Sequence, residues 1–157
     1  ILFTGNSVDV LGTHIHVLEA DGKTENTHKA LGLFPGHAEL TMNKRFFCSL
    51  LGNACGCDIV GFKTQFGHTY ELPEEYGFIR VERGKGIYPG ASMEGIHKNN
   101  LYATYLIGPI LVMNPTFTKF FLKSAGADVT LPFEDVSMKA YEIRLAEFKD
   151  RSRTGIG

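Results

Sequence analysis

The stretch ILFTGNSVDVLG, residues 1–12, determines the fold expected of this chain. Its first four residues are apolar or β-branched and favour a short strand. The tripeptide GNS that follows is turn-prone, and the apolar residues of VDVL have the spacing of a short helix that Gly12 would close. The stretch therefore predicts a strand that passes through a tight turn directly into a helix.

A second informative segment begins near residue 100. Residues 100–106 alternate like a strand until the Gly-Pro pair at 108 and 109 ends the pattern. Asn114 followed by Pro115 predicts an N-cap with proline at the first helical position, and Gly126 predicts the end of that helix.

Further elements follow from periodicity and from turn residues. A helix is predicted from Pro132 to about Arg151, where apolar residues recur near helical spacing, and residues 152–157 have no pattern. The glycine-rich stretch 84–95 predicts a long loop, either a partner-facing insertion or a plain surface loop. Strands are predicted around 14–18, 30–34, 58–62 and 76–83.

Size and composition favour one α/β globular domain spanning residues 1–157, with 43% hydrophobic and 21% charged residues. The net charge is −1 without a basic run, so neither nucleic acid nor a membrane surface is expected as a partner. Three cysteines, an odd number, do not form the framework of a secreted disulfide-rich domain. We expect reduced thiols and a cytoplasmic protein.

The two segments together resemble the class I glutamine amidotransferases of the cobyric acid synthase and lipid II isoglutaminyl synthase type. In that family a strand ends in a sharp turn that carries a nucleophilic Cys, as residues 1–12 would, and a later Thr-Tyr-Leu-His-Gly-Pro signature resembles residues 104–109. Loop 84–95 and the Gly61-Phe62 pair also stand in the expected order. The resemblance implies a flavodoxin-like three-layer sandwich with an antiparallel strand extension, of which this chain holds the later half without the preceding parallel strands.

Both catalytic positions of the family are replaced here. The thiol position aligns with Gly5 and the general base with Ile107, and neither residue can take part in proton transfer. Lys63-Thr64-Gln65 stands where relatives carry Glu-x-His or Asn-His, while Gly67-His68-Thr69 is similar to their Gly-Arg-Thr. Glycine still permits the strained backbone that such a turn needs.

The resemblance therefore predicts an inactive amidotransferase-like domain with a vestigial pocket. We expect an amino-acid-like ligand there, without a cofactor or metal, and a partner subunit or homo-oligomer that covers the sheet edge left by the missing strands. The alternatives are an active amidotransferase subunit that supplies ammonia for cobyrinate or cell-wall precursor amidation, and a purely structural oligomer-forming protein. The residues expected in the pocket are Thr4, Gly5, Asn6, Ser7, Gln65, His68, Tyr105, Ile107 and Gly108.

Other chemistries have weaker support in the sequence. Thr4 or Ser7 as a substitute nucleophile would need an adjacent base, which Ile107 does not supply. A zinc site from Cys55-x-Cys57 and His14-x-His16 lacks the usual two-residue spacing between cysteines. A Cys-His pair and a phosphate loop are weaker still, and they would use Cys48, Cys55 or Cys57 with His68 or His97, and Gly84-x-Gly86.

Overall fold

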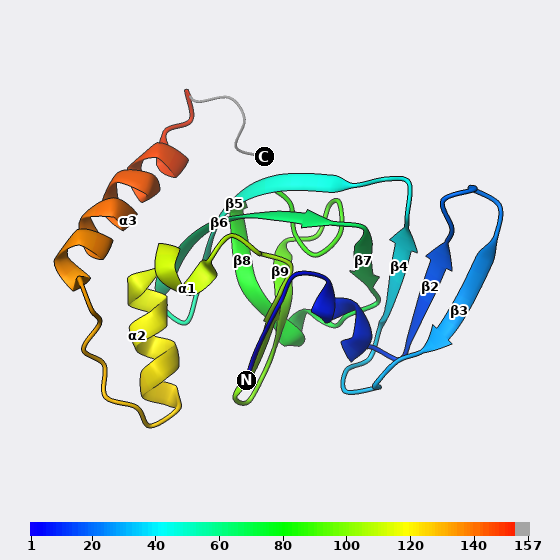
Figure 1. The fold of residues 1–157 in the computed structure, drawn as a ribbon, viewed down its shortest axis with the longest axis horizontal. Helices are drawn as coiled ribbons and strands as arrows, with labels where there is room; N and C mark the ends of the chain where they lie inside the picture. The colour runs from blue at the N-terminus through cyan, green and yellow to red at the C-terminus, as the bar shows by residue number, and fades with distance from the viewer. Residues whose placement is uncertain (153–157) are drawn as a thin grey trace.

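The structure, a computed structural model, describes residues 1–152. Figure 1 shows the helices on one side of a six-stranded sheet and a four-stranded sheet on the other side. The order in the larger sheet is β1 (Leu2–Thr4), β10 (Leu101–Thr104), β9 (Met93–Lys98), β8 (Gly77–Arg83), β5 (Phe46–Ala54) and β6 (Cys57–Gln65). The order in the smaller sheet is β3 (Glu25–Lys29), β2 (His14–Leu18), β4 (His37–Thr41) and β7 (Gly67–Tyr70).

The 3₁₀ helices are η1 (Gly5–Leu11) and η2 (Glu74–Tyr76), and the α-helices are α1 (Ile110–Met113), α2 (Pro115–Ser124) and α3 (Glu134–Lys149). The fold is thus mixed α/β, with two sheets and few helices. Within residues 1–152, no helix has the length and apolar character needed to cross a membrane.

The first sequence segment forms the strand, turn and helix that its pattern predicts, although the helix is of the 3₁₀ type. β1 pairs in parallel with β10, so that Thr4 lies opposite Thr104. β1 is the outermost strand of the six-stranded sheet. Its pairing with β10 brings the two segments that carry the family resemblance side by side.

The β5–β6 hairpin is the longest pairing in the larger sheet, from Phe46↔Gln65 to Ala54↔Cys57. Its two-residue loop, Cys55-Gly56, has φ of 54° and 73°, and positive φ at both positions suits the twist of the flanking strands. β6 leads through Phe66 into β7 of the smaller sheet, so one continuous stretch of chain joins the two sheets.

Apolar side chains cover both faces of the larger sheet. On one face, Phe78, Tyr102 and Leu106 pack against Ile110 of α1 and Phe117 of α2. On the other face, Ile96, Ala103 and Tyr105 pack against Val8 and Leu11 of η1 and against Phe34. The sheet is therefore the shared wall of two cores.

The predicted helix after Asn114 is confirmed. Pro115 is its first residue, and Gly126, with φ of 75°, lies just beyond its end. Asn114 occupies the N-cap position but makes no side-chain cap bond. Its amide instead accepts from Val60 N (2.8 Å) and donates to Val60 O (2.9 Å) and Ile110 O (2.8 Å), which ties the helix start to β6.

The strand predicted at 30–34 is wrong. This apolar stretch is irregular and follows β3. The backbone N–H groups of Leu31 and Gly32 donate to carbonyl oxygens of Val10 and Gly12, and that of Leu33 donates to Leu11 O. The backbone of this stretch closes the end of η1, where carbonyl groups lack partners within the helix. The predicted tail falls mostly outside the described residues.

Candidate functional site

The turn after β1 has the backbone conformation of a strained elbow. Thr4 is extended, and Gly5, buried, takes the left-handed conformation at φ 65°. The Ser7 hydroxyl donates to the Thr4 carbonyl oxygen at 2.7 Å and closes the turn. Thr4 and Asn6 are exposed. The chain therefore holds position 5 at the mouth of a tight strand-to-helix turn.

Ile107 lies directly against this turn. A Cβ atom built on Gly5 would be 2.9 Å from Ile107 Cγ2. The Ile107 N–H donates to Phe62 O at 3.1 Å, and a Cβ atom on Gly108 would overlap the Phe62 ring. The two positions taken from the family resemblance are thus adjacent in space, with Phe62 fixing the second of them.

Neither Gly5 nor Ile107 has a side-chain group that transfers protons or attacks a carbonyl carbon. Position 5 presents hydrogen and position 107 presents an aliphatic side chain, 39% exposed. The Ser7 hydroxyl is already bonded to the backbone of its own turn. A hydroxyl nucleophile requires an adjacent base, and the aliphatic side chain of Ile107 cannot act as a base.

A second, buried group of polar residues surrounds Tyr105. The Tyr105 hydroxyl donates to Asp9 Oδ1 at 2.6 Å and lies 2.9 Å from Thr69 Oγ1. Gly67 lies so close to the Asp9 carboxylate that a Cβ atom would overlap it. Burial raises the pKa of Asp9 from its usual 3.8 to about 6, and the Tyr105 hydrogen bond lowers it in part.

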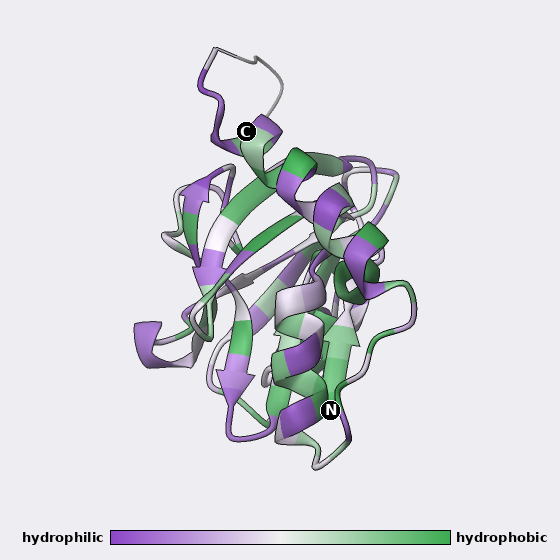
Figure 2. Cartoon of the chain, turned by 90° about the vertical axis from the view of Figure 1, so that its left-hand side faces the viewer, coloured by the Kyte–Doolittle hydropathy of each residue, from purple (hydrophilic) through white to green (hydrophobic). Residues whose placement is uncertain are grey.

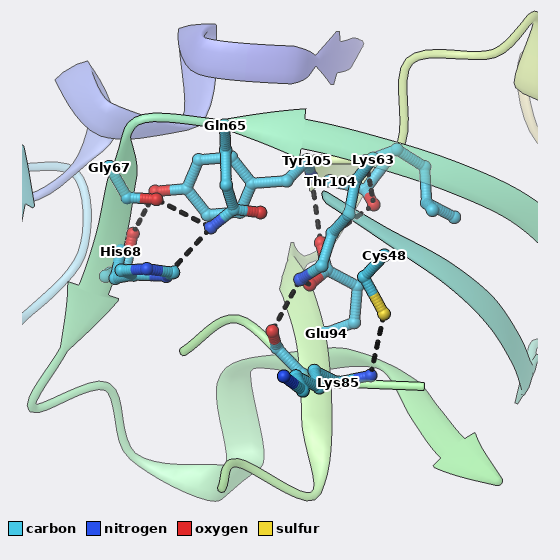
Figure 3. Close-up of polar contacts among 12 residues, drawn as sticks. Cys48, Lys63, Gln65, Gly67, His68, Lys85, Glu94, Thr104 and Tyr105 are labelled. Carbon is cyan, nitrogen blue, oxygen red and sulfur yellow. Dashed lines mark hydrogen bonds and ion pairs between the residues drawn. The ribbon is translucent and has the colours of Figure 1, made fainter. Parts of the chain in front are cut away.

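Gln65 and His68 form a pair beside this group (Figure 3). Gln65 Nε2 donates to Gly67 O at 2.6 Å and lies 3.0 Å from His68 Nδ1. Burial lowers the pKa of His68, which favours the neutral ring, in which Nδ1 can accept from Gln65 Nε2. The Gln65 Oε1 atom is buried and has no hydrogen-bond partner within residues 1–152.

Sequence reasoning missed the strongest electrostatic feature nearby. Lys63 and Glu94 form a fully buried ion pair, Nζ to Oε2, at 2.5 Å, and Lys63 Nζ also donates to Gly86 O. Glu94 Oε1 accepts from Tyr105 N at 2.8 Å and from Thr104 Oγ1 at 3.1 Å (Figure 3). The ion pair therefore anchors Thr104 and Tyr105, the residues that lead to Ile107.

The nine residues expected in one pocket thus fall into two groups. Thr4, Gly5, Asn6 and Ser7 form the turn, Ile107 lies against it and Gly108 follows Ile107, whereas Tyr105 belongs to the buried polar group and Gln65 and His68 lie beside that group. The side chain of Tyr105 is fully buried and is bonded to Asp9 rather than directed to Ile107. The sequence did not indicate that Asp9 belongs to this group, because an aspartate in a short helix is normally expected to be exposed to solvent.

The cysteines occupy other parts of the fold. Cys48 is buried in β5, where its sulfur contacts Lys85 N (3.2 Å) and Ser49 O (3.0 Å), and Cys55 and Cys57 lie at the β5–β6 turn. His14 and His16 are on β2 of the other sheet. No group of three or more His, Cys, Asp or Glu residues within 1–152 is arranged to hold a metal ion.

No family model matches the sequence. A curated glutamine-hydrolysing subunit does match part of it, and this relates the chain to glutamine amidotransferases. The relative is the lipid II isoglutaminyl synthase (glutamine-hydrolyzing) subunit GatD of Staphylococcus aureus (strain N315), 40% identical over 77 residues. These residues are 48% of this chain and 30% of GatD, so the chain matches less than a third of that relative's length.

Proposed function

We propose that this chain is a catalytically inactive glutamine amidotransferase-like domain with a structural, regulatory or ligand-binding role. The observation that carries the proposal is the contact between Gly5 and Ile107. A Cβ atom at position 5 would lie 2.9 Å from the Ile107 side chain, so the turn and its facing segment are close enough for a nucleophile and a base. Gly5 supplies no nucleophile, and Ile107 supplies no base.

The loss of both groups removes the chemistry of glutamine hydrolysis. That reaction needs a thiolate to attack the amide carbon and a base to accept and return a proton. The backbone elements that would serve such a thiolate remain, because Gly5 keeps positive φ and is followed directly by η1. A retained turn without its thiol fits a role in binding rather than in catalysis.

The same resemblance supports three further parts of the proposal, and the cysteines support a fourth. The described residues form part of a flavodoxin-like three-layer sandwich, and a partner subunit or a second copy packs against an exposed sheet edge. An amino-acid-like ligand binds near the turn, in contact with Ile107. The free thiols of Cys48, Cys55 and Cys57 fit a reducing compartment, the cytoplasm.

An active amidotransferase subunit is the second candidate. The identity to GatD favours it, because that relative is named as glutamine-hydrolysing. In this case the nucleophile would have to come from outside the Gly5 turn, and Cys48 is the buried thiol to test first.

Ammonia release from glutamine by the purified chain separates the two candidates. We expect no release from the native chain and activity from the double variant Gly5→Cys with Ile107→His. A correctly placed base contributes roughly 100-fold or more, so the double variant should exceed Gly5→Cys alone by at least that factor.

The matched control is Gly5→Ala with Ile107→His, which restores the base without a thiol and should be inactive. Release by the native chain would overturn the inactive assignment, and its loss in Cys48→Ser would identify a different nucleophile. An inactive but folded double variant would show that the turn does not hold the two groups in a reactive geometry.

A further inference from the structure

The β5–β6 turn carries two cysteines that flank one glycine. Cys55 is exposed, Cys57 is partly buried, and both thiols are free. The turn closes a hairpin in which Ala54 is paired with Cys57. Neither cysteine belongs to the Gly5 turn or to the polar group around Tyr105, so the candidate site leaves both thiols unused.

The two thiols lie close to each other. The Cys57 thiol donates to the carbonyl oxygen of Cys55 at 3.8 Å, so its sulfur rests against the backbone of the other cysteine. Partial burial, and then the nearby Cys57 thiol, raise the pKa of Cys55. The charge state of one sulfur therefore affects the other.

The backbone brings the two cysteines within reach of a disulfide bond. Cα atoms two residues apart are separated by at most about 7 Å in an extended chain, and a bend between them shortens the separation. Gly56 supplies this bend, because its φ of 73° is left-handed, and a Cβ atom built on it would meet nothing within 4 Å. A disulfide needs Cα atoms roughly 4.4–6.8 Å apart, so one can close over Gly56 in a turn that has room to adjust.

Cys55 occupies a position that its side chain does not favour. Its φ is 54°, and the first residue of a two-residue turn of this kind is usually Asn, Asp or Gly. Residues kept in the left-handed region against their preference cluster at functional sites. The thiol is what Cys55 provides there and an asparagine would not.

The surroundings give the two cysteines different access to solvent. Cys57 packs against the core that contains Phe117 of α2, whereas Cys55 is exposed. Burial, and then the nearby Cys55, raise the pKa of Tyr102, while a hydrogen bond with Ser124 at the end of α2 lowers it. Figure 2 views the molecule from this side, with α2 and α3 in front of the larger sheet. A small molecule therefore reaches Cys55 first, and Cys57 is held beside it against the core.

We propose that Cys55 and Cys57 form a reversible dithiol–disulfide site, which is oxidised by exchange with a low-molecular-weight disulfide of the glutathione class. The Cys55 thiolate attacks one sulfur of the small disulfide, forms a mixed disulfide and releases the first small thiolate. The Cys57 thiolate then attacks Cys55 Sγ and releases the second. Two protein thiols are oxidised, one small disulfide is reduced to two thiols, and the two protons pass through solvent to the released thiolates.

The bridge should open again when the reduced small thiol is in excess. A ring closed over a single residue has little freedom to reach the preferred disulfide geometry, and strained or exposed bridges are the labile ones. The site uses no residue of the Gly5 turn, so it stands whether or not that turn is catalytic.

Mass spectrometry of the purified chain after incubation with glutathione disulfide tests the proposal. The native chain should lose the mass of two hydrogens, with Cys55 and Cys57 joined in one peptide, and should regain it in excess reduced glutathione. Cys57→Ser should stop at a glutathione adduct on Cys55. Cys55→Asn keeps a residue that suits the turn and should lose most of the reaction. Cys48→Ser is the matched control and should form the bridge as the native chain does.

The oxidation rate should also rise about tenfold from pH 7 to pH 8, because the raised pKa of Cys55 keeps its reactive thiolate a minority form. Unchanged thiols, a glutathione adduct that persists on the native chain, or a bridge that includes Cys48 or joins two chains would each overturn the proposal. An adduct that forms on Cys57 at the native rate in Cys55→Asn would overturn the order of attack.

Discussion

Lys63 and Glu94 carry opposite charges into the interior, with both side chains fully excluded from solvent. Three further groups form hydrogen bonds with the pair, namely Gly86 O with the lysine, and Thr104 Oγ1 and Tyr105 N with the glutamate. The aromatic rings of Phe46 and Tyr105 also lie near the ammonium group. Such a pair adds little stability over apolar residues of the same size, but loss of one partner leaves an uncompensated charge.

Lys63→Met should therefore lower the free energy of unfolding by roughly 3–5 kcal/mol. Urea denaturation of the purified variant measures this. Lys149→Met is the matched control, because its ion pair with Asp58 is at the surface and its loss should lower the free energy of unfolding far less. Equal losses in the two variants would show that the buried pair is relaxed or hydrated.

Asp9 makes stability depend on pH in the opposite direction to most carboxylates. Its folded pKa, about 6, is higher than the usual 3.8, so between these values the folded state binds more protons than the unfolded state. Stability is then highest below pH 3.8 with respect to this group and falls as the pH rises through 6.

Asp9→Asn should remove that decline, because the Asn carbonyl oxygen still accepts from Tyr105 without a charge to bury. At pH 8 we expect the variant to unfold with a free energy larger by up to about 3 kcal/mol. Thermal melts from pH 4 to 8 provide the comparison. Asp21→Asn is the control, and it should lower the free energy of unfolding at pH 8 instead of raising it. Hydrogen bonds from Thr24 and Lys23 lower the pKa of the Asp21 carboxyl, so the charged form stabilises the folded state.

At the scale of elements, local signals predicted the helices well. Pro115 and Gly126 mark the two ends of α2 through backbone rules that act within a few residues, and the pattern of α3 gives its length to within two residues at each end. β3, β4, β5, β7 and β9 were not predicted. In β4 and β9, residues such as His37, Glu39 and His97 interrupt the apolar alternation. Which strand pairs with which depends on contacts that local periodicity does not encode.

The junction of α1, α2 and β6 depends on one amide. Asn114→Ala would leave both backbone groups of Val60 without their partners in the interior. We expect a loss of about 2–4 kcal/mol in the free energy of unfolding and faster amide exchange at Val60. Asn53→Ala, which removes only an exposed hydrogen bond to Asp58, is the control. Unchanged exchange at Val60 would mean that water replaces the amide.

For the molecule as a whole, the candidate site is a product of topology. The parallel pairing of β1 with β10 brings residue 5 next to residue 107, and the β5–β6 hairpin supplies Phe62 beneath them. The pairing of positions 5 and 107 follows from the family resemblance. The polar network of Asp9, Lys63 and Glu94 does not, because each member comes from a different element and their contacts span tens of residues of sequence.

The contact between Gly5 and Ile107 also constrains how such a sequence can evolve. A cysteine gained at position 5 faces a methyl group and finds no proton acceptor, and a histidine gained at position 107 faces a bare backbone turn. Because the two positions are in contact, a larger side chain at either one has to be accommodated by the other.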